Sequence, residues 1–168
     1  MNQKVSIIIP CRNEKDYIAK CLDSICNSIY DKNLLKVFVC DGLSSDGTAE
    51  IIKHYEKKYS FVHYRENRNR TTPHALNLGI KESDADIDII LGAHAEIDKD
   101  FILNSVNTFQ LDTQMGCVGG IIENVYENET SSAIGKAMSS RFGVGNAHFR
   151  TGSREGFVDT VAFGAYRK

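Results

Sequence analysis

The regular alternation of short apolar runs with amphipathic segments constrains this chain more than any other feature. Residues 5–10 (VSIIIP) and 37–40 (VFVC) are continuous apolar runs rich in β-branched side chains. Such runs are typical of strands that are covered on both faces. An amphipathic pattern follows each run. The alternation therefore predicts an α/β fold with a mostly parallel central sheet and helices on both of its faces.

The remaining apolar patterns extend this order along the chain. The first helical pattern is expected to begin near Glu14 and carries apolar residues from Tyr17 to Ile29, and the second covers residues 48–59. Further strands are expected at residues 61–65, 87–91, 115–122 and 159–166, and further helices at 73–79, 101–109 and 131–140. Pro73 suits the first turn of its helix. A loop is expected at residues 143–156.

Length and composition indicate one globular domain over residues 1–168, with 42% hydrophobic and 25% charged residues. The formal net charge of -2 gives no general attraction to nucleic acid or to an anionic membrane. Five cysteines without metal-ligand spacing, in a chain with no secretory signal, favour reduced thiols and a cytoplasmic location.

Polar residues directly follow the first two apolar runs. Residues 11–14 (CRNE) follow the first, and residues 41–48 (DGLSSDGT) follow the second. Ligands of open α/β sheets bind at the carboxyl ends of strands, so the two segments predict one shared site. Asp41 could accept a hydrogen bond from a base N–H or a ribose hydroxyl. Glu14 and Asp46 also suit helix starts, and we interpret Asp46 as partly structural.

Two further groups of side chains have both a functional and a structural interpretation. Arg65, Arg68 and Arg70 could neutralise a diphosphate, although charged loops are usually only solvated. His94 and Glu96 could hold a divalent cation, or His94 could simply form a hydrogen bond. No glycine-rich dinucleotide fingerprint, P-loop or nucleophile elbow is present, which argues against the corresponding enzyme classes.

Three segments together resemble family 2 glycosyltransferases of the GT-A fold. They are Val5-Ser6-Ile7-Ile8-Ile9-Pro10 with Asn13-Glu14, the segment Asp41-Gly42-x-Ser44-x-Asp46-Gly47-Thr48, and Ala75-x-Asn77-x-Gly79. Later segments, at residues 93–96, 143–147 and 158–167, are similar to the enzymes of succinoglycan-type exopolysaccharide assembly. The resemblance covers essentially the whole chain.

The resemblance implies a Rossmann-like GT-A domain that binds a nucleotide sugar, most often a UDP-sugar. Asp41 would contact the base, and Arg70 would lie near the base or the diphosphate. An inverting, hexosyltransferase-type reaction with a glycan or lipid-linked acceptor would serve polysaccharide biosynthesis. The implied nucleotide-sugar-binding residues are Pro10, Arg12, Asn13, Glu14, Asp41, Gly42, Ser44, Asp46, Arg70, Asn77 and Ala93.

The sequence departs from the family pattern at the metal motif. Gly92 stands where the family has the first acid of its Asp-x-Asp motif, which binds Mg²⁺ or Mn²⁺ on the diphosphate. His94, with help from Glu96, would then hold the cation, or arginines would carry the phosphate charge instead. The same substitution leaves open a non-catalytic nucleotide-binding or scaffold domain. A nucleotidyltransferase is a third alternative, but no glycine-rich basic loop lies near the first apolar run.

The general base of such enzymes is expected beyond Lys168, in a protein of which this chain would be an amino-terminal part. The longer protein is expected at the cytoplasmic face of a membrane. Neither the sugar, the acceptor nor the oligomeric state follows from the sequence.

Overall fold

The computed structural model describes residues 3–125, 156–158 and 160–168, and these residues form an α/β fold around a six-stranded sheet. The strand order is β3-β2-β1-β4-β6-β5. The strands are β1 (Val5–Cys11), β2 (Leu35–Asp41), β3 (Val62–Glu66), β4 (Ile87–Ile90), β5 (Cys117–Val118) and β6 (Ala165–Arg167). The helices of the described residues are α1 (Ile18–Cys26), η1 (Lys32–Leu34, a 3₁₀ turn), α2 (Thr48–Lys58), α3 (Thr72–Glu82) and α4 (Phe101–Leu111).

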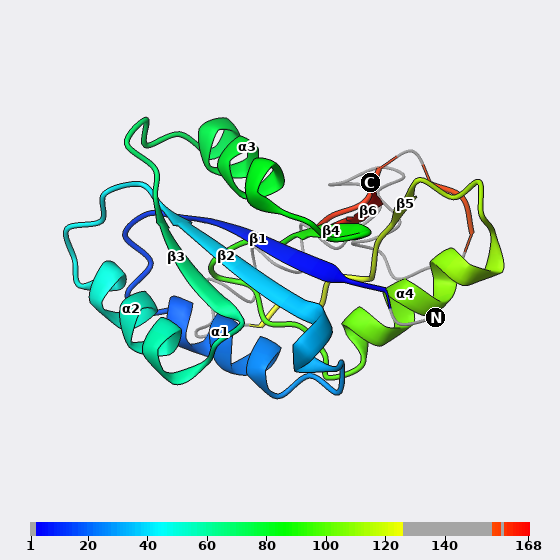
Figure 1. The fold of residues 1–168 in the computed structure, drawn as a ribbon, viewed down its shortest axis with the longest axis horizontal. Coiled ribbons are helices and arrows are strands. Elements are labelled where there is room, and N and C mark those ends of the chain that lie inside the picture. The colour runs from blue at the N-terminus through cyan, green and yellow to red at the C-terminus, as the bar shows by residue number, and fades with distance from the viewer. Residues whose placement is uncertain (1–2, 126–155, 159) are drawn as a thin grey trace. The chain divides into compact units, whose positions relative to one another are not determined.

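The first four strands are parallel, and their connections place helices on both faces of the sheet. The chain moves from β1 to β2 to β3 in one direction, then crosses to β4 on the other side of β1. Parallel crossovers are right-handed, so this reversal puts α3 on the face opposite to α1 and α2 (Figure 1). The strand order therefore reverses between β1 and β4. The predicted mostly parallel sheet with helices on both faces is confirmed.

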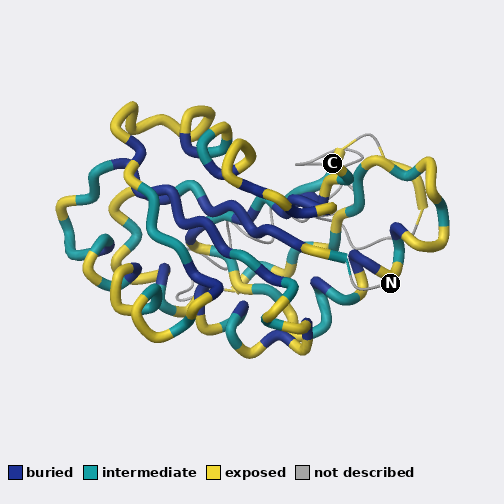
Figure 2. Tube along the Cα trace, viewed as in Figure 1, coloured by how far each residue is buried: buried dark blue, intermediate teal, exposed yellow. Residues whose placement is uncertain are grey.

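The core lies along the adjacent strands β1 and β2 (Figure 2). Ile7, Ile8 and Ile9 on β1 have no exposed surface, and neither do Val37 and Val39 on β2. Consecutive residues of a strand point to opposite faces, so uninterrupted burial requires a covered sheet on both sides. This explains why the two runs show no alternation between apolar and polar residues.

A close approach of helix α3 to strand β1 depends on a glycine. A Cβ atom on Gly79 would lie 2.5 Å from Cγ2 of Ile8 and 2.9 Å from its Cγ1. Ala75, one helical turn earlier, packs with Ile8, Phe38 and Cys40. The Ala75-x-x-x-Gly79 spacing thus puts two small residues on the face of α3 that contacts the sheet.

Several element boundaries differ from the sequence predictions. Helix α1 begins at Ile18 rather than near Glu14, and Ile29 lies beyond its end with 57% of its surface exposed. The strand predicted at residues 115–122 is reduced to β5, and the strand predicted at residues 159–166 begins only at Ala165. The helix predicted at residues 131–140 lies outside the described residues, as does the loop predicted at 143–156 except for Gly156.

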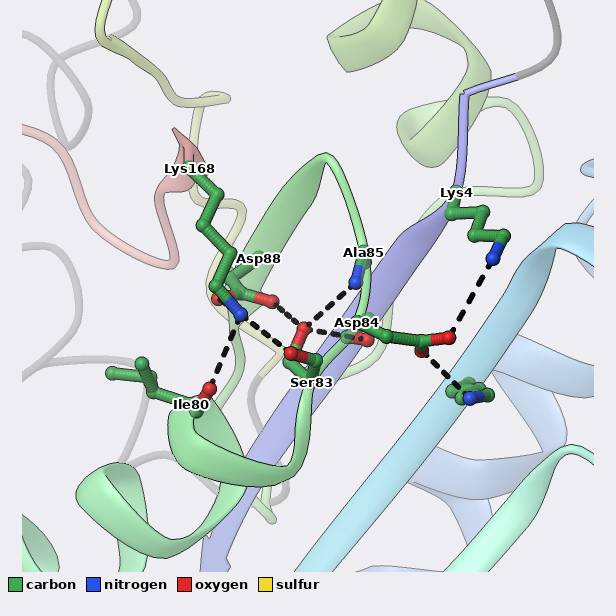
Figure 3. Close-up of polar contacts among 9 residues, drawn as sticks. Lys4, Ile80, Ser83, Asp84, Ala85, Asp88 and Lys168 are labelled. Atoms are coloured by element: carbon green, nitrogen blue, oxygen red, sulfur yellow. Dashed lines mark hydrogen bonds and ion pairs between the residues drawn. The ribbon is translucent and has the colours of Figure 1, made fainter.

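A buried polar network lies near the start of β4, on the side of the sheet that α3 covers (Figure 3). Asp88 is 6% exposed and accepts a hydrogen bond from the hydroxyl of Ser83, whose oxygen lies 3.0 Å from Oγ of Ser6. Nζ of Lys168 lies 4.0 Å from Oδ2 of Asp88 and donates to the carbonyls of Ile80 and Ser83. Lys168 therefore pairs with a buried acid and satisfies carbonyl groups at the end of α3.

The chain divides into two compact units, Met1–Val118 with Ala165–Lys168 and Gly119–Gly164. The whole six-stranded sheet belongs to the first unit. In the described residues of the second, Gly119 lies against the side chain of Val161. None of the helices in the described residues is both long enough and apolar enough to cross a membrane.

Candidate functional site

The carboxyl ends of the three strands β1, β2 and β3 lie side by side. Cys11 pairs with Asp41, and Asp41 pairs with Glu66, so the loops that follow all leave the sheet at the same edge. This edge flanks the position where the strand order reverses, which is where open α/β sheets bind ligands. The structure thus brings together the two polar segments that the sequence predicts to share a site.

Backbone groups of the first loop bond to side chains of the second. The backbone N–H of Glu14 donates to Oγ1 of Thr48 at 2.9 Å, and that of Lys15 donates to Oδ2 of Asp46 at 3.1 Å. Oδ1 of Asp46 accepts from the backbone N–H of Thr48 at 3.0 Å and from its hydroxyl at 2.6 Å. Both oxygens of Asp46 are therefore engaged in joining the loops and starting α2.

Asn13 and Ser44 make a second set of bonds between the same loops. The backbone N–H of Asn13 donates to Oγ of Ser44 at 2.8 Å, and its side-chain oxygen accepts from the backbone N–H of Ser45 at 3.0 Å. Asn13 adopts a left-handed backbone conformation with φ of 55°, which asparagine tolerates better than most residues. These side chains hold the loops in place, a role that the sequence did not assign to them.

The loop after β3 joins the same cluster through Asn67, which is only 5% exposed. Its backbone N–H donates to the carbonyl of Asp41 at 2.8 Å, and its side-chain amide donates to the carbonyl of Thr71 at 3.0 Å. Its own carbonyl accepts from the backbone N–H of Arg70 at 3.1 Å. Asn67 therefore fixes the path of the chain up to Arg70, which has φ of 59°.

The carboxylate of Asp41 sits at the centre of the cluster and is 1% exposed. Oδ1 accepts from the hydroxyl of Ser44, and Oδ2 accepts from the backbone N–H of Ser44 at 3.2 Å and from the hydroxyl of Tyr64 at 3.4 Å. Burial, followed by the charge and hydrogen bond of Asp41, raises the pKa of Tyr64 to about 12. The phenol therefore remains a hydrogen-bond donor at neutral pH.

Gly42 brings two arginines close together at the surface of the site. A Cβ atom on Gly42 would lie 3.3 Å from Cδ of Arg12 and 3.4 Å from Cα of Arg70. Both arginines are exposed, and among the described residues neither forms an ion pair. Arg65 and Arg68, by contrast, pair with Glu82 and Glu66. Of Arg65, Arg68 and Arg70, only Arg70 has no ion pair among the described residues, so its guanidinium group is available to a ligand. The guanidinium group of Arg12 is available in the same way.

The turn after β4 reaches the same edge of the sheet. The backbone N–H of Leu91 donates to the carbonyl of Ile8, and Ala93 is buried in the turn that follows. Nδ1 of the exposed His94 lies 3.7 Å from Oε1 of Glu14. His94 is thus near the end of β1, and its close acidic neighbour is Glu14 rather than the predicted Glu96.

The described residues contain no group of three or more His, Cys, Asp or Glu side chains arranged to hold a metal ion. At this edge, the side chains of His94 and Glu14 lie close enough together to be considered as ligands of one cation, with 3.7 Å between Nδ1 and Oε1. Magnesium-type sites in enzymes commonly use one or two protein ligands together with phosphate oxygens of the substrate. Glu14 supplies one carboxylate of the kind these cations prefer, and His94 supplies an imidazole, which suits them less well than an oxygen ligand. Together the two side chains are too few for a cation held by protein alone.

Pro10 and Asn77, which were also predicted to bind the nucleotide sugar, lie outside the hydrogen-bonded loops. Pro10 lies near the end of β1, opposite Cys40 and beyond the last residue of β1 that pairs with β4, so it lacks a neighbour on one side. Asn77 is exposed on α3, between Ala75 and Gly79, which face the sheet. No hydrogen bond joins Asn77 to the loops that follow β1, β2 and β3 in the described part of the chain.

Sequence reasoning missed three residues that build the site, namely Thr48, Tyr64 and Asn67. Thr48 and Asn67 stand in polar, turn-rich segments, so a signal for local bonding was present. Tyr64 lies within a short strand, and nothing in the sequence connects its hydroxyl to Asp41. That contact depends on the register between β2 and β3, in which Tyr64 is opposite Val39.

Comparison with known proteins yields consistent matches. The family model for Glycosyl transferase family 2 matches residues 6–166. The chain is 37% identical over 168 residues to a dolichyl N-acetyl-alpha-D-glucosaminyl phosphate 3-beta-D-2,3-diacetamido-2,3-dideoxy-beta-D-glucuronosyltransferase of Methanococcus voltae, with 96% of this chain and 52% of that protein covered. It is 30% identical over 138 residues to a poly-beta-1,6-N-acetyl-D-glucosamine synthase of Staphylococcus aureus, with 82% and 32% covered. The chain thus spans about half or less of the curated relatives it matches.

Solved structures agree on the fold. A mannosyltransferase from Pyrobaculum calidifontis in complex with GDP-Man and Mn²⁺ superposes with a TM-score of 0.66 at 27% identity, covering 73% of this chain and 36% of that one. The S. aureus protein TarS (residues 1–349) in complex with UDP-GlcNAc gives a TM-score of 0.66 at 19% identity, covering 74% and 36%. These neighbours are GT-A glycosyltransferases. The chain belongs to glycosyl transferase family 2 and has the GT-A fold.

Proposed function

We propose that this chain binds the nucleoside-diphosphate sugar of a glycosyltransferase, with UDP as the nucleotide. The observation that carries the proposal is the convergence, at one edge of the sheet, of the buried carboxylate of Asp41 with Arg12 and Arg70, which form no ion pair within the described part of the chain. A carboxylate suits a base N–H, and guanidinium groups suit diphosphate oxygens. A single ligand with both features satisfies both parts of the site.

The diphosphate is both the bound group and the leaving group of the proposed reaction. Negative charge grows on it as the bond to the sugar breaks, so cations fixed nearby stabilise the transition state. Arg12 and Arg70 are the side chains proposed for this task, and both lie close to Gly42.

A divalent cation, Mg²⁺ or Mn²⁺, would share the neutralisation of the diphosphate. His94 and Glu14 are the protein donors proposed for it, with phosphate oxygens supplying further ligands. Gly92 provides no carboxylate, so the arginines are expected to bear more of the phosphate charge here than they would beside an acid.

The acceptor is proposed to be a glycan or lipid-linked sugar, and the transfer to invert the anomeric carbon. The relatives are named for transfer to a dolichyl-linked sugar phosphate and for synthesis of a polysaccharide, which supports such acceptors. Inversion requires a general base that takes the proton of the acceptor hydroxyl. No residue described here is assigned that role. A cytoplasmic location, next to a membrane, would suit a lipid-linked acceptor.

Titration calorimetry with UDP, with and without Mn²⁺, tests donor binding. We expect the chain to bind UDP, and Arg12→Ala or Arg70→Ala to weaken binding roughly tenfold because a charge-assisted contact is lost. The matched control is Arg68→Ala, because Arg68 is 85% exposed at its side chain and already pairs with Glu66. A chain that gives no heat with UDP, or variants that all bind alike, would contradict the proposal.

A non-catalytic nucleotide-binding or scaffold domain is the second candidate, and Gly92 is the observation that favours it. Sugar transfer by the full-length protein distinguishes the two functions. Transfer with Gly92 in place supports the enzyme. Transfer only after Gly92→Asp, with UDP binding unchanged, supports the scaffold.

A further inference from the structure

The number of acceptor positions left on the Asp41 carboxylate bears on which base the site selects. An ionised carboxylate offers about four lone-pair positions. Three donors occupy Asp41 already, namely the backbone N–H and the hydroxyl of Ser44 and the hydroxyl of Tyr64. One position on Oδ1 therefore remains, beside the Ser44 hydroxyl.

The direction of the Ser44 hydrogen bond is fixed by its neighbours. The backbone N–H of Asn13 can only donate, so Oγ of Ser44 accepts from it at 2.8 Å. The single hydroxyl proton of Ser44 is then free to point at Oδ1 of Asp41. The conformation of the first loop thus determines which way the Ser44 proton faces.

We infer that Ser44 is a positioning residue that limits Asp41 to one ligand N–H and so makes the site select uracil over guanine. Uracil presents a single ring N–H between two carbonyl groups. Guanine presents two neighbouring donors, a ring N–H and an amino group, which together need two acceptor positions. The inference rests on the proposed function, since it assumes that a nucleotide base contacts Asp41.

Burial strengthens the expected discrimination. Asp41 is 1% exposed, so water has little access to its carboxylate and cannot readily replace a contact that a base fails to make. A buried donor left without a partner is unfavourable, and the second donor of guanine would be left in that state. The base is not decided by the solved neighbours, since one was determined with GDP-Man and another with UDP-GlcNAc.

The test is the ratio of the dissociation constants for GDP and UDP, measured by titration calorimetry on the whole chain. Ser44→Ala removes the hydroxyl and frees a second position on Oδ1. We expect UDP to bind more weakly and the GDP-to-UDP ratio to fall roughly tenfold. Ser44→Thr keeps a hydroxyl and should retain the ratio of the unmodified chain. The matched control is Ser45→Ala, since Ser45 is exposed and bonds the first loop only through its backbone.

Each outcome separates the possibilities. Equal weakening of UDP and GDP by Ser44→Ala would mean that Ser44 only holds the loop, and would overturn the inference. So would an unmodified chain that prefers GDP, or a ratio that also falls in Ser45→Ala. If neither nucleotide binds the unmodified chain, the proposed function fails together with the inference. If UDP binds the unmodified chain but Ser44→Ala does not change the ratio of the GDP and UDP dissociation constants, the inference is overturned and the proposed function is retained.

Discussion

The polar side chains at this site either join the loops or remain available to a ligand. The structure assigns Asn13, Ser44 and Asp46 to the first group, whereas the sequence placed them in the second. Asn13, Ser44 and Asp46 were all predicted to bind the nucleotide sugar. Their hydrogen bonds are made within the protein, where they join the loops after β1 and β2. Arg12 and Arg70, which form no ion pair among the described residues, are the side chains proposed to contact the ligand.

The bonds of Asp46 predict how stability depends on pH. Hydrogen bonds from Thr48 and from the backbone N–H of Lys15 lower the pKa of Asp46 below its usual value. The folded state therefore favours the ionised form more than the unfolded state does, and this contribution is present above about pH 4. It is lost as the pH falls further, through the lowered pKa.

Urea denaturation at several pH values measures this effect. Between about pH 5 and pH 2.5, the free energy of unfolding should fall more steeply in the unmodified chain than in Asp46→Asn. Asp16→Asn is the control, because Asp16 is exposed and has no hydrogen bond among the described residues. Parallel curves for the unmodified chain and Asp46→Asn would contradict the assignment.

The position of Asp41 could be predicted from the sequence, and its contacts could not. An acid directly after a buried apolar run must lie at a strand end, whatever the rest of the fold. The bond between Asn13 and Ser44 spans 31 residues and exists only because β1 and β2 pair with Cys11 opposite Asp41. The register between β1 and β2 depends on the packing of the whole sheet, so it cannot be predicted from the sequence of either segment alone.

Among the elements, α1 and α3 differ in how closely the structure follows the local sequence pattern. The apolar spacing of α1 includes Tyr17, which caps the helix, and the helix begins at Ile18. The backbone N–H groups of Asn13, Glu14 and Lys15, before the helix, donate to side chains of the loop after β2. In α3 the pattern and the structure agree, and Pro73 stands in the first turn as expected.

The contact between α3 and β1 predicts an unfavourable Gly79→Ala substitution. Alanine normally stabilises a helix by about 0.5–1 kcal/mol relative to glycine. Here the new methyl group would lie 2.5 Å from Cγ2 of Ile8, and overpacking of this kind typically costs about 1–3 kcal/mol. We expect a net loss on the order of 1 kcal/mol in the free energy of unfolding.

Chemical denaturation of a double mutant checks the cause. Ile8→Ala removes both atoms nearest to the added methyl group, so Gly79→Ala should be less unfavourable in that background than alone. Lys81→Ala, on the exposed side of the same helix, should change stability by less than about 0.5 kcal/mol. Simple additivity of Gly79→Ala and Ile8→Ala would exclude the steric explanation.

At the scale of the whole first unit, the sheet combines a part that the sequence predicts and a part that it does not. The parallel order of β1 to β4 follows from alternating apolar and amphipathic segments. The antiparallel insertion of β6 between β4 and β5 does not, because three residues carry too little pattern to specify a partner. Lys168, next to β6, helps to hold this strand by its contacts with Asp88 and the end of α3.

The two labelled lysines in Figure 3, Lys168 and Lys4, allow a comparison of a buried and an exposed acid in ion pairs. Lys168→Met leaves the buried carboxylate of Asp88 without its cation and should lower the free energy of unfolding by about 1–2 kcal/mol. Lys4→Met breaks a pair with Asp84 whose side chains are 57% and 53% exposed and leaves Asp84 paired with Lys36, so the loss should be clearly smaller. Equal losses in urea denaturation would show that burial of Asp88 does not matter.

The place of β6 in the sheet also has a consequence for biosynthesis. Strands β1 to β4 are complete once Ile90 has left the ribosome, but β4 then has an open outer edge until Ala165–Arg167 follows. Open strand edges can pair with other chains. During translation, the edge of β4 therefore depends on late-emerging residues, while the strands β1 to β3 that carry the proposed nucleotide site can already pair with one another.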